Sequence, residues 1–256
     1  MIQPIGLDEF LSGPWPDRAC ILADLDGCLL SGDVPLPHVE DLFARCADRL
    51  WVVSNNSTDT PETLSRRLAG LGLPLPAERI LLAGAETLRM LARTRPDARI
   101  ALFAAPPLLA FARVLGLVLD RVNPDVMVLA RDTGLRFDDL AQAVRLVHAE
   151  TPVILTNPDP THPDPQGLPV PETGAIWAAI AAAVPTARAQ TFGKPKPALV
   201  VEALRRADFP ASSAVFIGDT SATDGEAAHA AGIEFVLLRR PGASVEPTSR
   251  HLVGTP

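Results

Sequence analysis

The chain has 256 residues, of which 47% are hydrophobic, and its formal net charge is −7. This length fits one large domain or two smaller ones, and the hydrophobic share suffices for a globular core. The acidic balance, with a pI of about 5.2, argues against a surface for nucleic acid or for an anionic membrane. The longest apolar run, residues 174–184, is too short to cross a bilayer.

The expected compartment is the cytoplasm. The first ten residues contain Asp8 and Glu9 and lack a basic flank or a long apolar region, so they do not resemble a secretory signal. The three cysteines, at positions 20, 28 and 46, have neither metal-ligand spacing nor an even number for disulfides. Both observations favour a reducing environment.

The first half of the chain reads as alternating strands and helices. Residues 1–18 form a helical or irregular lead-in, and the apolar run 20–23 predicts a strand buried on both faces. Residues 29–37 predict a tight hairpin or flap, residues 38–48 a short helix, and residues 50–53 a second buried strand. Thr60 and Pro61 have the form of an N-cap and first helical position, and Gly70 or Gly72 ends that helix.

Two carboxylates follow the first strand directly. Asp24 and Asp26 are two residues apart, and in an extended segment both side chains point to the same side and repel each other. A polar turn made with Gly27 would be the plain explanation. A divalent cation is the functional one, because Mg²⁺ is commonly held by one or two carboxylates and a substrate phosphate.

A second polar stretch follows the second strand. Residues 54–58, Ser-Asn-Asn-Ser-Thr, lie at the carboxyl end of that strand, where ligands bind in open α/β sheets. Their hydroxyls and amides either satisfy the loop itself or contact phosphate oxygens.

From about residue 84 the pattern predicts a separate α/β insertion. Its expected strands are residues 99–104, 116–120, 125–130 and 152–157, and its helices are residues 107–115 and 137–150. The proline-rich stretch 158–165 predicts a stiff loop, and residues 174–184 predict a buried or interface helix.

After this insertion, the alternation of buried strands and helices seen in the first part of the chain returns. An amphipathic helix ends near Asp208, the strand 214–217 runs into Gly218-Asp219 with Asp224 five residues on, and the strand 234–238 precedes a polar tail. Lys194 and Lys196 are the only lysines in a chain with 23 basic residues. A compact ammonium suits a crowded phosphate site better than a planar guanidinium.

These four stretches, in this order, resemble the haloacid dehalogenase-like superfamily of phosphohydrolases. The matching motifs are Asp24-Leu25-Asp26-Gly27, Ser54-Asn55-Asn56-Ser57, Gly193-Lys194-Pro195 and Gly218-Asp219 with Asp224. An insertion between the second and third motifs is similar to the α/β cap of the NagD-like, or para-nitrophenylphosphatase-like, branch. The chain departs from that pattern at Cys28, where threonine is usual, and at Ala222 and Gly225.

The resemblance implies a Rossmann-like α/β core of parallel strands, residues 1–83 and 189–256, and an α/β cap, residues 84–188. It implies an Mg²⁺-dependent phosphatase acting on a small phosphomonoester such as a nucleotide, sugar phosphate or phosphoglycolate. Asp24 would form an aspartyl-phosphate, and Asp26 would act as acid and base. The residues implied for the phosphate are Ser54, Asn55, Asn56 and Lys194, and those for the metal are Asp24, Asp219 and Asp26, the last through its carbonyl.

Other roles stay expectations. Asp224 would orient Lys194 or a metal-bound water, and the cap loop would select the substrate through Asn157, Asp159, His162 and Asp164. The apolar helices of the cap are candidates for a homodimer interface. A phosphomutase or phosphotransferase, or a catalytically silent binding module, are the alternative functions of the same fold.

Overall fold

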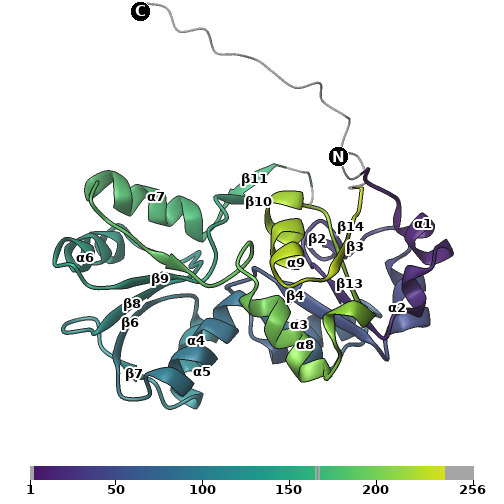
Figure 1. Ribbon diagram of the computed structural model, residues 1–256. Helices are drawn as coiled ribbons and strands as arrows, with labels where there is room; N and C mark the ends of the chain where they lie inside the picture. The colour runs from purple at the N-terminus through teal and green to yellow at the C-terminus, as the bar shows by residue number, and fades with distance from the viewer. Residues whose placement is uncertain (1–2, 165, 167, 240–256) are drawn as a thin grey trace, which may run out of the picture.

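Two five-stranded parallel sheets form the framework of the protein (Figure 1). The computed structural model describes residues 3–239 except 165 and 167. The expected polar tail, residues 240–256, therefore lies outside the described residues. No described helix is both long and apolar enough to cross a membrane.

The first sheet carries the motifs. Its strand order is β14-β13-β1-β4-β5. The bounds are β1 Cys20–Ala23, β4 Leu50–Ser54, β5 Ile80–Leu82, β13 Ala214–Gly218 and β14 Glu234–Leu237. Four of these strands were expected, and β5 was not. Alternate side chains pack on opposite faces, since Ile21 joins one hydrophobic cluster and Leu22 the other.

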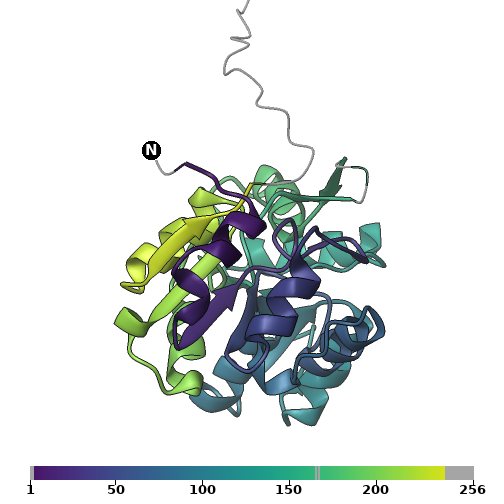
Figure 2. The same cartoon turned by 90° about the vertical axis from the view of Figure 1, so that its right-hand side faces the viewer.

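Helices cover both faces of this sheet (Figure 2). They are α1 Leu7–Ser12, α2 Val39–Cys46, α3 Pro61–Gly70, α8 Ala198–Ala207 and α9 Glu226–Ala230. The expected start of α3 is confirmed: Thr60 and Thr63 cap each other's backbone, and Pro61 takes the first position. The flap is also confirmed, as an antiparallel hairpin of β2 Leu30–Ser31 and β3 Val34–Pro35.

Four single-turn elements complete this part of the fold. They are η1 Trp15–Asp17, η2 Ala77–Arg79, η3 Ala211–Ser213 and the π-helical turn η4 Ser221–Gly225.

The second sheet has the order β12-β9-β8-β6-β7. The bounds are β6 Arg99–Phe103, β7 Val118–Leu119, β8 Val126–Leu129, β9 Val153–Leu155 and β12 Gln190–Thr191. The helices around it are α4 Ala83–Thr94, α5 Pro106–Val114, α6 Phe137–His148 and α7 Thr173–Ala183. The sequence did not indicate α4 or β12, and β12 pairs with β9 although it lies beyond residue 188.

Two expectations differ from the structure. The stretch expected to be a loop contains a strand, because β10 Thr161–Pro163 pairs antiparallel with β11 Pro169–Pro171. Prolines at the edges of so short a ribbon hid it, since they donate no ladder hydrogen bond. Of the two alternatives for residues 174–184, the structure excludes only a helix buried all round: α7 packs through Ile180, its alanines 178, 179, 182 and 183 face solvent, and the interface helix stays a prediction.

Candidate active site

The predicted motifs converge at one edge of the first sheet. Asp24 follows β1, Ser54 ends β4 and Asp219 follows β13, and these three strands are neighbours. Because parallel strands end at the same edge, the side chains come together around a cavity of about 760 Å³. Asp24, Asp26, Asp219 and Lys194 all line it. Residues 170 positions apart in the chain therefore share one site.

Lys194 is buried at the bottom of this cavity, with 2% of its surface exposed. Its Nζ donates to Asp24 Oδ1 and to Asp224 Oδ1, each at 2.6 Å. The Asn55 side chain fixes the Lys194 backbone, since its Oδ1 accepts from the Lys194 N–H at 2.8 Å and its Nδ2 donates to the Lys194 carbonyl at 2.9 Å. The ammonium group is therefore held firmly against the carboxylate of Asp24.

Burial and the neighbouring charges together shift the pKa values of these groups. It raises the pKa of Asp24 well above its usual range, and Lys194 opposes that shift. Burial also raises the pKa of Asp26, against the opposing charge of Arg67. For Lys194, burial alone would lower the pKa, but Asp224 and Asp24 raise it above its usual value. The lysine is thus a permanent cation beside two buried acids.

The donor atoms fit a hard divalent cation. Carboxylate oxygens of Asp24, Asp219 and Asp224 lie within 4.8 Å of one another. Asp224 has other partners, because one oxygen accepts from Lys194 and the other from the Thr220 N–H at 3.1 Å. Asp24 and Asp219 would supply an oxygen-only pair of ligands, which is what Mg²⁺ prefers. The Asp26 side chain is not in this group, and ligation through its carbonyl stays a prediction.

In the polar loop after β4, the Asn56 side chain forms hydrogen bonds within the loop itself. Asn56 Oδ1 accepts from the N–H groups of Thr58 and Asp59, and its Nδ2 donates to Asp59 Oδ2. Ser54 Oγ accepts from the Asn56 N–H at 3.1 Å, which leaves its hydroxyl proton to donate elsewhere. Ser54, Asn55 and Asn56 line the cavity. The Asn56 side chain shapes this loop and the Asn55 side chain holds the Lys194 backbone, so phosphate contacts from them stay a prediction.

The departures from the family pattern are tolerated locally. Cys28 is buried, and its Sγ lies 3.6 Å from the Ile217 carbonyl, which the hydroxyl of a threonine could also reach. Ala222 is exposed on η4. A Cβ on Gly225 would lie 3.1 Å from the Phe235 ring, so a small residue suits this position.

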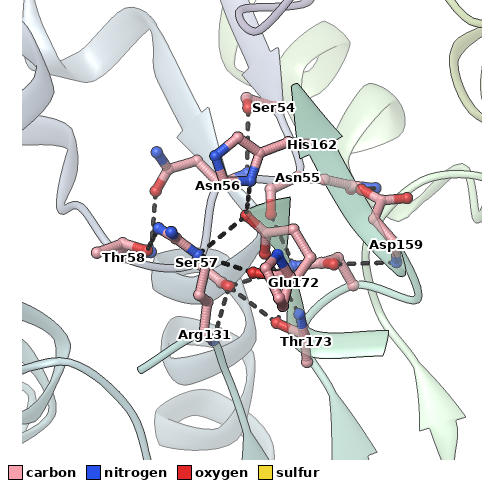
Figure 3. A network of polar contacts seen from close by, with 12 residues as sticks. Ser54, Asn55, Asn56, Ser57, Thr58, Arg131, Asp159, His162, Glu172 and Thr173 are labelled. Carbon is pink, nitrogen blue, oxygen red and sulfur yellow. Dashed lines mark hydrogen bonds and ion pairs between the residues drawn. The ribbon is translucent and has the colours of Figure 1, made fainter. Parts of the chain in front are cut away.

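Three of the four expected selectivity residues line the cavity: Asp159, His162 and Asp164. Asn157 does not belong to the lining. Its Nδ2 donates to the Asn55 carbonyl at 2.9 Å, and to Ser57 Oγ and Thr173 Oγ1, each at 3.2 Å. This buried cluster joins the segment after β4 to the segment after β9 and to the start of α7, and Figure 3 shows its members Ser57 and Thr173.

A group that the sequence did not reveal lies on the far wall of the cavity. Figure 3 shows the carboxylate of Glu172 between the His162 ring and the Arg131 guanidinium. All three side chains line the cavity, and burial raises the pKa of Glu172 to about 7. Glu172 precedes α7 and Arg131 follows β8. Only the strand-end position of Arg131 could have indicated such a role.

Known proteins resemble the chain over most of its length. It is 31% identical over 221 residues to the dihydroxyacetone phosphatase of Corynebacterium glutamicum, covering 85% of this chain and 80% of the relative. It is 31% identical over 228 residues to the D-glycerol 3-phosphate phosphatase of Mycobacterium tuberculosis. That match covers 87% of this chain but 63% of the relative, so the chain spans less than two thirds of that protein.

Solved structures agree with the sequence matches. The structure of glycerol phosphate phosphatase from Mycobacterium tuberculosis in complex with magnesium has a TM-score of 0.80 at 28% identity, over 89% of this chain and 70% of that one. A 4-nitrophenylphosphatase from Thermotoga maritima has a TM-score of 0.82 at 27% identity, over 90% and 89%. The profile of the haloacid dehalogenase-like hydrolases matches residues 18–232. The chain therefore belongs to the haloacid dehalogenase-like hydrolase family, in its NagD-like, para-nitrophenylphosphatase-like branch.

Proposed function

We propose that the protein hydrolyses a small phosphorylated metabolite, with Asp24 as nucleophile and Lys194 as the main cation for the phosphoryl group. The chain is a phosphoric monoester hydrolase whose cofactor is Mg²⁺. The observation that carries the residue roles is the Lys194 ammonium, 2.6 Å from both Asp24 and Asp224 at the bottom of the cavity. Positioning and charge stabilisation are most of what phosphoryl transfer requires.

The chemistry follows from two carboxyl groups with different roles. An Asp24 oxygen attacks phosphorus while the bond from phosphorus to the ester oxygen breaks, and Asp26 gives its proton to the departing alkoxide. Asp26 then takes a proton from water, the hydroxide attacks phosphorus, and the Asp24 carboxylate is released with inorganic phosphate. The raised pKa of Asp26 favours the protonated form that the first step needs. Bound Mg²⁺, held by Asp24, Asp219 and the Asp26 carbonyl, would neutralise charge on the phosphoryl oxygens.

The substrate is a free metabolite and not a phosphorylated folded protein or a nucleic acid. A cap of residues 84–188 over a core of residues 1–83 and 189–256 would cover the leaving group and exclude water. The named relatives act on dihydroxyacetone phosphate and glycerol 3-phosphate, which are small and hydroxylated. The net charge of −7 supports the exclusion of nucleic acid.

Selectivity would come from the cap side of the cavity. Asp159, His162 and Asp164 reach it from β10 and the segments around it, whereas Asn157 would position the loop. Replacing His162 and Asp164 by alanine should change the order of kcat/KM across a set of phosphomonoesters and keep the metal requirement. An unchanged order would contradict this assignment.

A phosphate-release assay tests the function directly. We expect turnover of small phosphomonoesters with Mg²⁺, loss of turnover with a chelator, and poor replacement by Ca²⁺, which is larger and less rigidly coordinated. Rates on a phosphorylated folded protein equal to those on metabolites would refute the small-molecule proposal. Transfer of phosphate to a second metabolite without release to water would refute hydrolysis.

Two further proposals concern context. The exposed alanine face of α7 supports a homodimer formed through the cap helices. Three free, buried cysteines support a reducing cytoplasm. Measuring the molar mass in solution tests the first, and fractionation of the producing cells tests the second.

A further inference from the structure

The cavity that holds the catalytic motifs is strongly acidic. Its described lining includes eight carboxylates: Asp24, Asp26, Asp33, Asp59, Asp159, Asp164, Glu172 and Asp219. The same lining contains the cations Arg67, Arg131 and Lys194, besides His162. A substrate phosphate has Lys194 and the metal as counter-charges. A second anionic group on the substrate would need another cation.

Each described cation of this lining already has a carboxylate partner. Lys194 pairs with Asp24 and Asp224. Arg67 pairs with Asp59 at 3.2 Å and with Asp33 at 3.6 Å. Arg131 pairs through Nε with Glu172 Oε1 at 3.4 Å.

Arg131 is the cation that one residue could release. In the described part of the chain, Glu172 is its only carboxylate partner. Its other contacts are neutral oxygens, the Pro171 carbonyl at 3.3 Å and Thr58 Oγ1 at 3.5 Å. The Arg131 and Glu172 side chains are 20% and 14% exposed, so solvent screens their attraction only in part. Glu172 therefore controls how much positive charge this wall offers.

His162 does not change the net charge that Arg131 and Glu172 give to this wall. Its Nδ1 lies 2.7 Å from Glu172 Oε1, but the ring is not oriented for a hydrogen bond. Burial lowers the pKa of His162, and Arg131 lowers it further, so the ring is neutral at pH 7. The wall made by Arg131, His162 and Glu172 is close to neutral when Glu172 is ionised.

We propose that Glu172 is a specificity-determining residue: by pairing with Arg131, it makes the site favour leaving groups with hydroxyl or carbonyl oxygens over leaving groups with a carboxylate. A substrate hydroxyl can donate to the carboxylates of the wall. A substrate carboxylate meets Asp159, Asp164 and Glu172 without a free cation. This inference rests on the proposed function, and it assigns polyol or ketose phosphates, and not phosphorylated acids, as the substrate class.

A matched pair of substrates isolates the effect. Glycerol 3-phosphate and 3-phosphoglycerate have the same carbon chain and differ by a hydroxymethyl group against a carboxylate. The quantity to measure is the ratio of kcat/KM for 3-phosphoglycerate to kcat/KM for glycerol 3-phosphate, at pH 8 with Mg²⁺. We expect a wild-type ratio well below one.

Glu172→Gln should raise this ratio by about tenfold, because it removes one negative charge and frees Arg131. The amide oxygen can still accept the Thr173 N–H that Glu172 caps. Arg131→Gln should lower the ratio by about fivefold, because Glu172 is then uncompensated. The control is Asp139→Asn, which breaks the part-buried pair with Arg121 at 2.8 Å, outside the cavity lining, and should leave the ratio unchanged.

The outcomes separate the two proposals. A ratio within about twofold of wild type in Glu172→Gln, or a shift in the same direction in both variants, overturns the role of Glu172. If Glu172→Gln does not fold, an unchanged ratio in Arg131→Gln has the same consequence. If wild type hydrolyses neither these two substrates nor any other small phosphomonoester, the proposed function itself fails.

Discussion

At the scale of single residues, the surroundings of Lys194 explain why this position is a lysine in a chain whose basic residues are nearly all arginine. Its ammonium is buried, touches two carboxylates at 2.6 Å and lies 5.4 Å from the centre of the Phe216 ring. A guanidinium is broader and planar, and it could not occupy the same space without displacing its neighbours.

We therefore expect Lys194→Arg to lower kcat by at least about 100-fold, although the charge is retained. Lys196→Arg is the matched control, because Lys196 is exposed two residues away and should tolerate the change. Steady-state kinetics with a common phosphomonoester give both values. Equal, mild effects at the two positions would show that the shape of the cation does not matter.

Asp24 is the proposed nucleophile, and its removal should separate folding from chemistry. Asp24→Asn keeps the shape but cannot attack phosphorus effectively, so we expect kcat to fall by more than about 1000-fold. Phosphate release measures the loss, and far-UV circular dichroism checks the fold. Activity within about tenfold of wild type, a barrier change below about 1.4 kcal/mol, would exclude Asp24 as nucleophile.

Glu172 predicts a dependence of stability on pH. Its pKa in the folded chain is about 7, raised mainly by burial from an ordinary value of 4.5. A raised pKa gives a contribution that is complete below about pH 4.5 and is lost as the pH rises through about 7. The free energy of unfolding of wild type minus that of Glu172→Gln should therefore fall by on the order of 2 kcal/mol between pH 5 and pH 8.

Urea unfolding at several pH values measures this difference. Glu40→Gln, at an exposed position of α2, is the control for the loss of a glutamate carboxylate elsewhere in the chain. A difference for Glu172→Gln that does not vary with pH would show that its carboxyl group titrates alike in the folded and unfolded chains.

The residues that follow strands were the easiest to predict from the sequence. Asp24, Ser54 and Asp219 follow apolar runs directly, so their convergence follows from parallel pairing alone. Glu172 and Arg131 meet although they lie on separate segments, just after β11 and just after β8, and no local periodicity contains that information. Asn157 was expected at the cavity but lies in the buried cluster with Ser57 and Thr173. A polar residue after a strand is compatible with either position, so the sequence could not distinguish them.

At the scale of elements, a buried carboxylate links two helices. Glu86 on α4 is 1% exposed, and its oxygens accept from Arg89 and, on α8, from Arg206, each at 2.5 Å. Removing one partner of such a group leaves the other charges without compensation, which commonly costs more than the pair contributes.

Glu86→Ala should accordingly lower the free energy of unfolding by about 3 kcal/mol. Asp125→Ala is the control, because Asp125 and Arg99 form a pair in which both side chains are nearly half exposed, so its loss should be much smaller. Chemical denaturation of both variants gives the comparison. Similar losses would mean that burial of the Glu86 pair adds nothing.

The fold was predictable where pattern and length agreed. The strands 20–23 and 214–217 were clear because short apolar runs bounded by polar residues are typical of buried parallel strands. Strand β5 and helix α4 share one apolar stretch, Ile80-Leu81-Leu82-Ala83, that contains no turn residue, so the sequence did not show where one ends. The ribbon of β10 and β11 depends on pairing across the chain and on prolines that normally argue against strands.

At the scale of the whole molecule, the two sheets share one hydrophobic cluster. It contains Val52 and Leu82 of the first sheet, Ile100 and Val128 of the second, and Leu88 of the helix that connects them. The chain is also tightly packed next to the buried cluster of Asn157, Ser57 and Thr173, since a Cβ on Gly174 would lie 2.2 Å from the Pro158 carbonyl.

This continuity predicts that core and cap unfold together. Calorimetry should show one transition, with a van't Hoff enthalpy close to the calorimetric enthalpy. The alternative result, two separated transitions, would show that the contacts between core and cap contribute little to the stability of either. Ser57→Ala, which removes the hydroxyl that Asn157 and the Arg131 N–H contact, should then widen any separation.

The contrast between Lys194 and Lys196 also makes the protein convenient for chemical labelling. An amine-reactive dye acts on unprotonated, accessible amines, whereas the Lys194 amine is protonated and buried. Among the lysine side chains the dye should attach to Lys196 alone, and peptide mapping by mass spectrometry would identify it. The fluorophore on Lys196, two residues from the active-site ammonium, would then report substrate binding without any engineered cysteine.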